Sequence, residues 1–301
     1  MRAFFRGKPA LGFAGFLCLV LAFAVALDAL ALAVMRPFFI RCGRFWLDDF
    51  EITQKAHPEA VWDRVFYGSS IVIAGYREEE SGSGYINCGM DNATVRDLQA
   101  LLAGGYIRIG SELVLGVDEL TLYDDFPTNP NYIWHKKWYE PYCYFARSRF
   151  QVLLQQTAEQ FLGVAWPPYP YLSQEKGYYW GAMGEAELRE KLKSPSYLPY
   201  LALSEEDFDE NFAALDWVWR WCGQHGVRLR ILFMPANPVI EPSVSVERAK
   251  RRLETFCAER EIEYHDKRDD YDAECFYDSS HFNREYGSHR FTKEIDPWLS
   301  S

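Results

Sequence analysis

The chain has 301 residues, of which 49% are hydrophobic and 25% charged, as in an ordinary globular protein. Its length accommodates one large domain with room for an insertion. The net charge of −11 argues against nucleic acid as a partner, because phosphate binding requires a basic face.

The N-terminal region combines a basic leader with a long apolar stretch. Residues 1–8 carry three basic side chains, and residues 9–35 are almost wholly apolar apart from Asp28. An apolar span of about 20 residues crosses a bilayer as a helix. Because the apolar core of a cleaved signal peptide has only about 7–15 residues, we predict an uncleaved transmembrane anchor. Cleavage near Ala29 and Ala31, which would release a secreted protein, is the alternative.

A connector and the first half of the main domain follow. Residues 36–60 are predicted to be the connector, and the acidic run Asp48–Glu51 is expected to be solvated. The main domain, residues 61–301, opens with apolar strands that alternate with polar loops and a helical pattern. In chain order we predict a strand at Trp62–Tyr67, a loop at Glu78–Gly84, a strand at Tyr85–Cys88, a helix at Thr94–Leu102 and a strand at Glu112–Val117.

An aromatic-rich insertion, at about residues 122–204, interrupts this alternation. It is rich in Tyr, Trp and Pro, and a helix is predicted at Arg147–Phe161. Two interpretations remain open for its rings. They form a small satellite core, or some of them line a groove for a glycan or lipid substrate.

The alternation of helices and strands returns after the insertion. We predict helices and strands at Phe208–Cys222, Val227–Met234, Val244–Arg260, Ile262–His265 and Asn283–Ile295, in the order helix, strand, helix, strand, helix. The predicted fold is therefore an α/β domain, with a parallel sheet between layers of helices.

The cysteines give no indication of a cofactor. The chain has seven, with no C-x-x-C pair and no Cys/His cluster at metal spacing, so neither a metal nor another cofactor is expected. Their number is odd, and the sequence leaves open whether they pair as disulfides or remain thiols.

Two distant stretches carry the residues of a hydrolase triad. The apolar run in Val65–Gly75 breaks at Gly68, which places Ser70 just after a predicted strand. A serine hydroxyl becomes a nucleophile when a histidine takes its proton and a carboxylate orients that histidine. Asp278 and His281 lie three residues apart in a predicted turn, which lets the carboxylate fold back onto the imidazole. Both stretches follow strands, so they are expected at the carboxyl edge of the sheet.

The same residues resemble the sequence blocks of the SGNH (GDSL-type) hydrolase superfamily. Gly68–Ser70 resembles its Gly-Asp-Ser block, with Ser70 at the nucleophile position, and Asn87–Gly89 resembles its second block. Asp278–Asn283, followed by Gly287, resembles its last block and is the most specific match. The resemblance implies a three-layer SGNH/flavodoxin-like fold. It also implies an oxyanion hole formed by the backbone amides of Ser70 and Gly89.

The third family block is where the sequence departs from the pattern. Asp118 stands where the family has the asparagine of the oxyanion hole, and an ionised carboxylate repels an oxyanion. Five explanations stay open. Asp118 points elsewhere, or burial protonates it; Asn92 replaces the missing donor; the hole uses only the amides of Ser70 and Gly89; or activity has been lost.

The serine block and the apolar N-terminus together resemble a membrane-anchored branch of the superfamily. This branch includes DltD, of D-alanyl lipoteichoic acid synthesis, and the SGNH proteins of alginate O-acetylation. The resemblance implies a single-pass protein of the cell membrane whose catalytic domain is extracytoplasmic. It further implies an esterase or O-acyltransferase of cell-surface polymers, with a multi-spanning membrane acyltransferase as partner. The alternative is a catalytically weakened binding or scaffold protein of such an acylation system.

Overall fold

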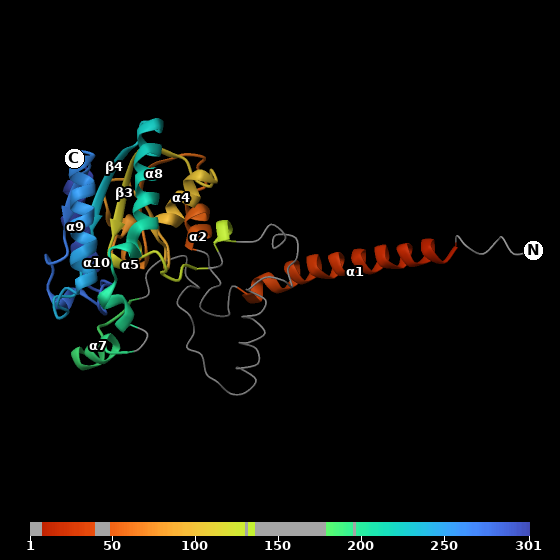
Figure 1. The fold of residues 1–301 in the computed structure, drawn as a ribbon, viewed down its shortest axis with the longest axis horizontal. Helices are drawn as coiled ribbons and strands as arrows, with labels where there is room; N and C mark the ends of the chain where they lie inside the picture. Colours follow the sequence, from red (N-terminus) through yellow and green to blue (C-terminus); the bar gives the residue numbers. More distant parts are fainter. Residues whose placement is uncertain (1–7, 40–48, 130–131, 136–178, 195–196) are drawn as a thin grey trace, which may run out of the picture. The chain divides into compact units, whose positions relative to one another are not determined.

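The computed structural model describes residues 8–39, 49–129, 132–135, 179–194 and 197–301 (Figure 1). The chain divides into two compact units. One comprises Met1–Leu47 and Pro130–Leu172, and the other comprises Asp48–Asn129 and Ser173–Ser301. Most of the aromatic insertion, including the predicted helix at Arg147–Phe161, lies outside the described residues.

The described part of the first unit contains one long apolar helix, α1 (Lys8–Phe39), and a 3-10 turn, η2 (Ile133–His135). Within α1, Phe13–Leu30 has a mean hydropathy of 2.4, and its side chains are not buried. By length and composition this stretch can cross a membrane, as a helix of about 20 apolar residues does. A signal sequence has the same properties, so the choice between anchor and cleaved signal stays open.

The second unit is built on a sheet of five parallel strands. The strands are β1 (Trp62–Gly68), β2 (Ile86–Gly89), β3 (Ile109–Val117), β4 (Arg228–Phe233) and β5 (Glu263–Asp266), in the spatial order β2-β1-β3-β4-β5. The predicted α/β class and parallel sheet are thus confirmed. The largest difference in strand boundaries is in β3, which begins at Ile109 rather than Glu112, because its first residues continue the pairing with β1.

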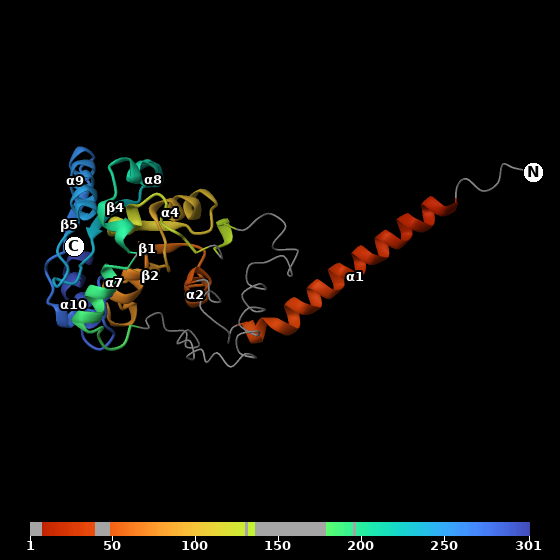
Figure 2. The same ribbon diagram turned by 60° about the horizontal axis from the view of Figure 1, so that its bottom comes forward.

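Helices cover both faces of the sheet (Figures 1 and 2). On one face, Phe66, Val114 and Leu232 share a buried cluster with residues of α3 (Ser70–Gly75) and α10 (Gly287–Leu299). Side chains alternate along a strand, so the neighbouring strand residues point to the opposite face. That face is covered by α4 (Val95–Ala103), α8 (Asp209–His225) and α9 (Val244–Glu259).

Shorter helices occupy the connections. They are α2 (Asp49–Ala56), η1 (Glu78–Glu80), α5 (Glu119–Leu122), α7 (Glu185–Leu192), η5 (Leu198–Ala202), η6 (Glu206–Phe208) and η7 (Ala273–Cys275). The expectation that the whole acidic run near residue 50 is solvated was wrong for Asp49. This side chain is 1% exposed, and its carboxylate accepts a hydrogen bond from the backbone N–H of Asp91 at 2.8 Å.

The closing helix, α10, begins later than the sequence predicts. Its predicted start was Asn283, but the helix begins at Gly287. The reason is that Asn283 Oδ1 accepts hydrogen bonds from the backbone N–H groups of Tyr286 (3.0 Å) and Gly287 (2.8 Å). The asparagine side chain thereby holds a non-helical turn just before the helix.

Candidate active site

The strand order places a crevice at the carboxyl ends of β1 and β3. From β1 the chain passes to β2 on one side, while β3, β4 and β5 follow on the other side. In open parallel sheets, ligands bind outside the strand ends at such a reversal. Ser70 follows β1 and Asp118 follows β3, so both candidate residues emerge at this point.

Three glycines in register line these strand ends. Gly68 pairs with Gly89 of β2 on one side and with Gly116 of β3 on the other. A Cβ atom on Gly68 would lie 2.3 Å from a methyl carbon of Val72, and one on Gly116 would lie 2.6 Å from the same atom. A Cβ on Gly89 would lie 2.6 Å from the backbone nitrogen of Ile73. The missing side chains therefore let α3 lie directly against the strand ends, with Ser70 as its first residue.

The segment with Asp278 and His281 is a short closed loop. An antiparallel bridge joins Phe276 and Phe282, whose rings stack at a centroid distance of 4.8 Å. Inside the bridge, the N–H of Tyr277 donates to the carbonyl of His281 at 2.8 Å. The two phenylalanines thus bury the ends of this loop, and the polar residues between them include the acid and the base.

Ser70, His281 and Asp278 form a continuous hydrogen-bond chain. Ser70 Oγ lies 2.8 Å from His281 Nε2, and His281 Nδ1 lies 2.8 Å from Asp278 Oδ1. The same Oδ1 also accepts hydrogen bonds from the backbone N–H groups of Ser280 (3.2 Å) and His281 (3.0 Å). The carboxylate is thus fixed by its own turn and can hold the imidazole in the tautomer that leaves Nε2 as acceptor.

Asp278 is held in its ionised form. Its side chain is 4% exposed, and burial alone would raise its pKa. His281 and Lys191 oppose this effect, and the pKa of Asp278 lies well below its ordinary value. A carboxylate that stays negative at neutral pH is what stabilises a histidine when it takes up a proton.

The backbone N–H of Gly89, one of the two oxyanion donors expected from the sequence, is already engaged. It donates to the side-chain oxygen of Asn87 at 2.9 Å. The Nδ2 of Asn87 in turn donates to the carbonyl of Tyr76 at 2.6 Å, which ties β2 to the end of α3. The amide of Ser70 is in the first turn of α3, where N–H groups have no partner within the helix. Among the expected backbone donors, the structure therefore favours Ser70 over Gly89.

Asp118 caps a helix. Its Oδ1 accepts hydrogen bonds from the N–H of Thr121 (2.8 Å) and from the hydroxyl of Thr121 (2.6 Å) at the start of α5. Burial raises the pKa of Asp118, and these hydrogen bonds and nearby His281 act in the opposite direction. Asn92, the other expected replacement donor, follows β2 in a turn with a φ of 53°, a backbone conformation that asparagine tolerates well. Among the described residues, no hydrogen bond joins Asn92 to the triad, so its oxyanion role stays a prediction.

The raised pKa of Glu119, the residue after Asp118, can be tested by measuring stability at two pH values. Burial and the charge of Asp118 raise the pKa of Glu119 to about 7. The folded state then retains a proton that the unfolded state has already lost, so Glu119 makes stability fall as pH rises from about 4.5 to 7. We expect Glu119→Gln to flatten this slope and to raise the free energy of unfolding at pH 8 by about 1–2 kcal/mol.

Urea unfolding of the full-length protein in detergent at pH 5 and pH 8 measures this difference. Glu187→Gln, at an exposed position on α7, serves as the control because it removes one carboxylate without any burial. Equal pH slopes for wild type and Glu119→Gln would contradict the expectation.

Two residues that contact the triad could not be identified from the sequence. Tyr179 stacks on the imidazole of His281 with a centroid distance of 4.1 Å, and Lys191 Nζ lies 3.0 Å from Asp278 Oδ2. Tyr179 is one of many tyrosines in the aromatic insertion, and Lys191 belongs to a helix rich in charged residues. Only the folded chain shows that this part of the insertion reaches the triad.

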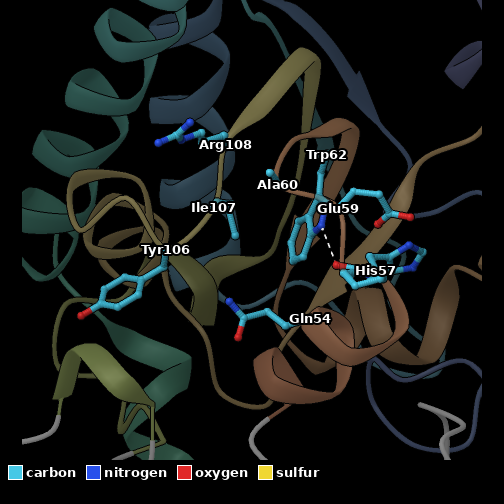
Figure 3. Close-up of a pocket in the computed structure, with 9 residues that line it drawn as sticks. Gln54, His57, Glu59, Ala60, Trp62, Tyr106, Ile107 and Arg108 are labelled. Atoms are coloured by element: carbon cyan, nitrogen blue, oxygen red, sulfur yellow. Dashed lines mark hydrogen bonds between the residues drawn. The ribbon is translucent and has the colours of Figure 1, made fainter.

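Two of the hollows in the described part of the chain lie at opposite ends of the strands. One, with an empty volume of about 350 Å³, is lined by Gln54, Trp62 and Arg108 among others (Figure 3). It lies where β1 begins, at the opposite edge from the triad, so it is not a candidate for the same chemistry. The other, of about 530 Å³, is lined by Asp118, by Ser279 and Ser280 of the triad turn and by further charged and apolar residues. It is the hollow beside the candidate active site.

No protein-family model matches the chain, and no curated protein matches it. The functional assignment therefore rests on the geometry of the site.

Proposed function

We propose that the protein is a membrane-anchored serine esterase or O-acyltransferase that acts on acyl esters of cell-surface polymers. The observation that carries the proposal is the unbroken chain of hydrogen bonds from Ser70 through His281 to Asp278, each link 2.8 Å long. The position of this chain at the carboxyl edge of a parallel sheet supports it further. The apolar helix α1 supports the membrane location. The resemblance to membrane-anchored SGNH proteins is the reason for proposing that the main domain lies outside the cytoplasm.

In the proposed reaction, His281 accepts the hydroxyl proton of Ser70 while the serine oxygen attacks the carbonyl carbon of the ester. Asp278 stabilises the imidazolium that forms. The amide of Ser70 donates a hydrogen bond to the oxyanion. His281 then returns the proton to the departing alcohol, and an acyl-enzyme remains on Ser70. Water completes hydrolysis, or a polymer hydroxyl takes the acyl group and completes a transfer.

The resemblance to SGNH hydrolases agrees with the roles that the structure gives to the motif residues. The glycine at each strand end makes room for α3, and Asn283 holds the turn before α10. These are structural requirements of the site, so they support the family proposal without identifying the acyl group. A multi-spanning membrane acyltransferase is the partner that we propose for a transferase.

The alternative is a binding or scaffold protein of an envelope acylation system with little turnover. Two observations favour it. Asp118 carries a carboxylate where an oxyanion donor is expected, and the amide of Gly89 is bonded to Asn87. Loss of one oxyanion donor costs about 10²–10³ in rate, which weakens an enzyme without disassembling its triad.

Labelling by a fluorophosphonate separates the two functions. We expect the full-length protein in detergent to react with the probe at Ser70, because phosphonylation requires an activated hydroxyl and, like ester cleavage, develops negative charge on an oxygen that the oxyanion hole stabilises. Peptide mapping identifies the labelled residue. An unlabelled wild-type protein that also fails to cleave p-nitrophenyl acetate would favour the scaffold protein.

Asp118→Asn tests the oxyanion hole itself. Asparagine keeps a side-chain oxygen for Thr121 and adds an amide donor. We expect kcat for p-nitrophenyl acetate at pH 8 to rise about tenfold, because a donor replaces a carboxylate that opposes the oxyanion. Asp118→Ala, which loses the helix cap without gaining a donor, is the matched control. If Asn and Ala reduce kcat equally, the carboxylate of Asp118 is itself required.

A further inference from the structure

A stretch of the insertion, Tyr179–Leu192, lies against the loop that carries the acid and the base; we call it the clamp segment. Backbone hydrogen bonds fix it on both sides of the loop. The N–H of Arg284 donates to the carbonyl of Tyr179 at 2.7 Å, and the N–H of Met183 donates to the carbonyl of Tyr277 at 2.6 Å. The clamp segment is therefore built onto the loop through the backbone.

The aromatic end of the clamp segment contacts the base. The ring of Tyr179 lies 4.1 Å from the ring of His281, and the two planes are inclined by only 13°. A stacked ring restricts rotation of the imidazole away from Ser70. Its π face also lies against a ring that becomes positive when it takes the serine proton, which is a favourable arrangement.

The helical end of the clamp segment contacts the acid. Lys191 Nζ lies 3.0 Å from Oδ2 of Asp278, while Oδ1 of the same carboxylate accepts from His281. The side chain of Asp278 is 4% exposed and that of Lys191 is 40% exposed, so the ion pair is buried at one end only. The carboxylate thus has a cation on one oxygen and the base on the other.

The charges around His281 oppose one another. Asp278 from its own loop and Asp118 from the end of β3 favour the imidazolium. Lys191 on α7 disfavours it, both directly and by drawing the charge of Asp278 toward itself. In the described part of the chain, Ser70 and Tyr179 also contact the ring, and their side chains ordinarily carry no charge near pH 7.

We propose that the clamp segment positions the base of this site: Tyr179 holds the imidazole ring in place, and Lys191 places a positive charge on the carboxylate that orients it, which disfavours the imidazolium. The expected effect of the clamp segment on turnover rests on the proposed function. The expected effect of Lys191 on the titration of His281 does not rest on that function, because the histidine titrates whether or not an ester is cleaved.

Titration of the histidines by NMR tests the role of Lys191. The full-length protein, with its six histidines labelled by ¹³C at Cε1, is titrated in detergent micelles, and His281→Asn assigns the signal. We expect Lys191→Met to raise the pKa of His281 by about 0.5–1 unit, because one nearby positive charge is lost across a partly solvated gap. The acid limb of the profile of kcat/KM against pH moves to higher pH by the same amount. Lys191→Arg keeps the charge and the wild-type profile.

Lys193→Met is the matched control. Lys193 is on the same end of α7, is 71% exposed and pairs with Glu190 instead of the triad. Its loss removes the same charge and should leave the titration of His281 within about 0.2 unit, since exposed charges are strongly screened. The proposal is overturned if Lys191→Met also leaves the titration within that range.

Tyr179→Leu and Tyr179→Phe test the ring. Leucine removes the stacked aromatic face, and we expect kcat for p-nitrophenyl acetate to fall about tenfold with little change in KM. Phenylalanine keeps the face and should keep kcat within about twofold. Equal losses for both variants would overturn the proposed role of the ring.

The two proposals fail separately. If the pKa of His281 shifts in Lys191→Met but wild-type protein neither reacts with a fluorophosphonate nor cleaves an ester, the clamp segment positions His281 as proposed and the protein is not an esterase. If wild-type protein is active but the pKa does not shift, only the role of Lys191 is lost.

Discussion

Ser70→Ala and His281→Ala are each expected to lower kcat for p-nitrophenyl acetate by at least about 10³-fold and to abolish labelling by a fluorophosphonate. The two side chains share one hydrogen bond of 2.8 Å. Ser70 attacks the ester efficiently only when His281 accepts its proton, so the loss of either residue removes the same step. Because they act as a unit, the double variant should be no slower than the slower single variant. Rates from steady-state assays of full-length protein in detergent measure the loss.

Ser69→Ala is the control for the nucleophile. Ser69 precedes Ser70 and is similarly buried, but it has no hydrogen bond to His281. It should therefore retain labelling and most of the wild-type rate. Labelling that survives in Ser70→Ala would assign the nucleophile to another residue and contradict the triad.

The largest effect on stability is expected for Gly287→Ala. A Cβ atom at Gly287 would lie 1.8 Å from the carbonyl oxygen of Cys275, which is closer than any non-bonded contact allows. To relieve the clash, α10 must move away from the loop that carries His281. We expect a loss of about 3–5 kcal/mol in the free energy of unfolding, as for severe overpacking of a buried site. Urea unfolding followed by circular dichroism measures it.

Gly223→Ala provides the comparison for the same substitution in another helix. Gly223 is in α8, and a Cβ there meets nothing within 4 Å. Alanine in a helix interior is favoured over glycine by about 0.5–1 kcal/mol, so this variant should be at least as stable as the wild type. If both variants unfold at the same urea concentration, the close approach of α10 to Cys275 is not a constraint.

The sheet could be predicted from the sequence because its strands are short apolar runs between polar turns. β4 is an example, where a strongly apolar run ends at Pro235. Helix boundaries and burial that depend on side-chain hydrogen bonds were harder to predict from the sequence. Asn283 delays the start of α10, and Asp49 is buried in spite of its acidic neighbours. In each case a specific polar contact with a distant or non-helical backbone group outweighs the local pattern.

The candidate site could be predicted in part. The spacing of Asp278 and His281 is local, so it is visible in the sequence. The contacts of Tyr179 and Lys191 with these two residues join segments that are far apart in the chain. The hydrogen bond from Gly89 to Asn87 could not be predicted for a different reason. Its donor is a backbone amide, and every residue except proline has one.

The loop closed by Phe276 and Phe282 has a consequence for the order in which the site assembles during folding. Its acid and base are three residues apart, so their contact requires the closure of only a small loop. The contact between Ser70 and His281 spans 211 residues and requires β1 and the later strands to have paired. Contacts of long sequence separation form late and slowly. The appearance of a reactive serine during refolding therefore reports completion of the sheet, whereas the orientation of the histidine by its carboxylate can precede it.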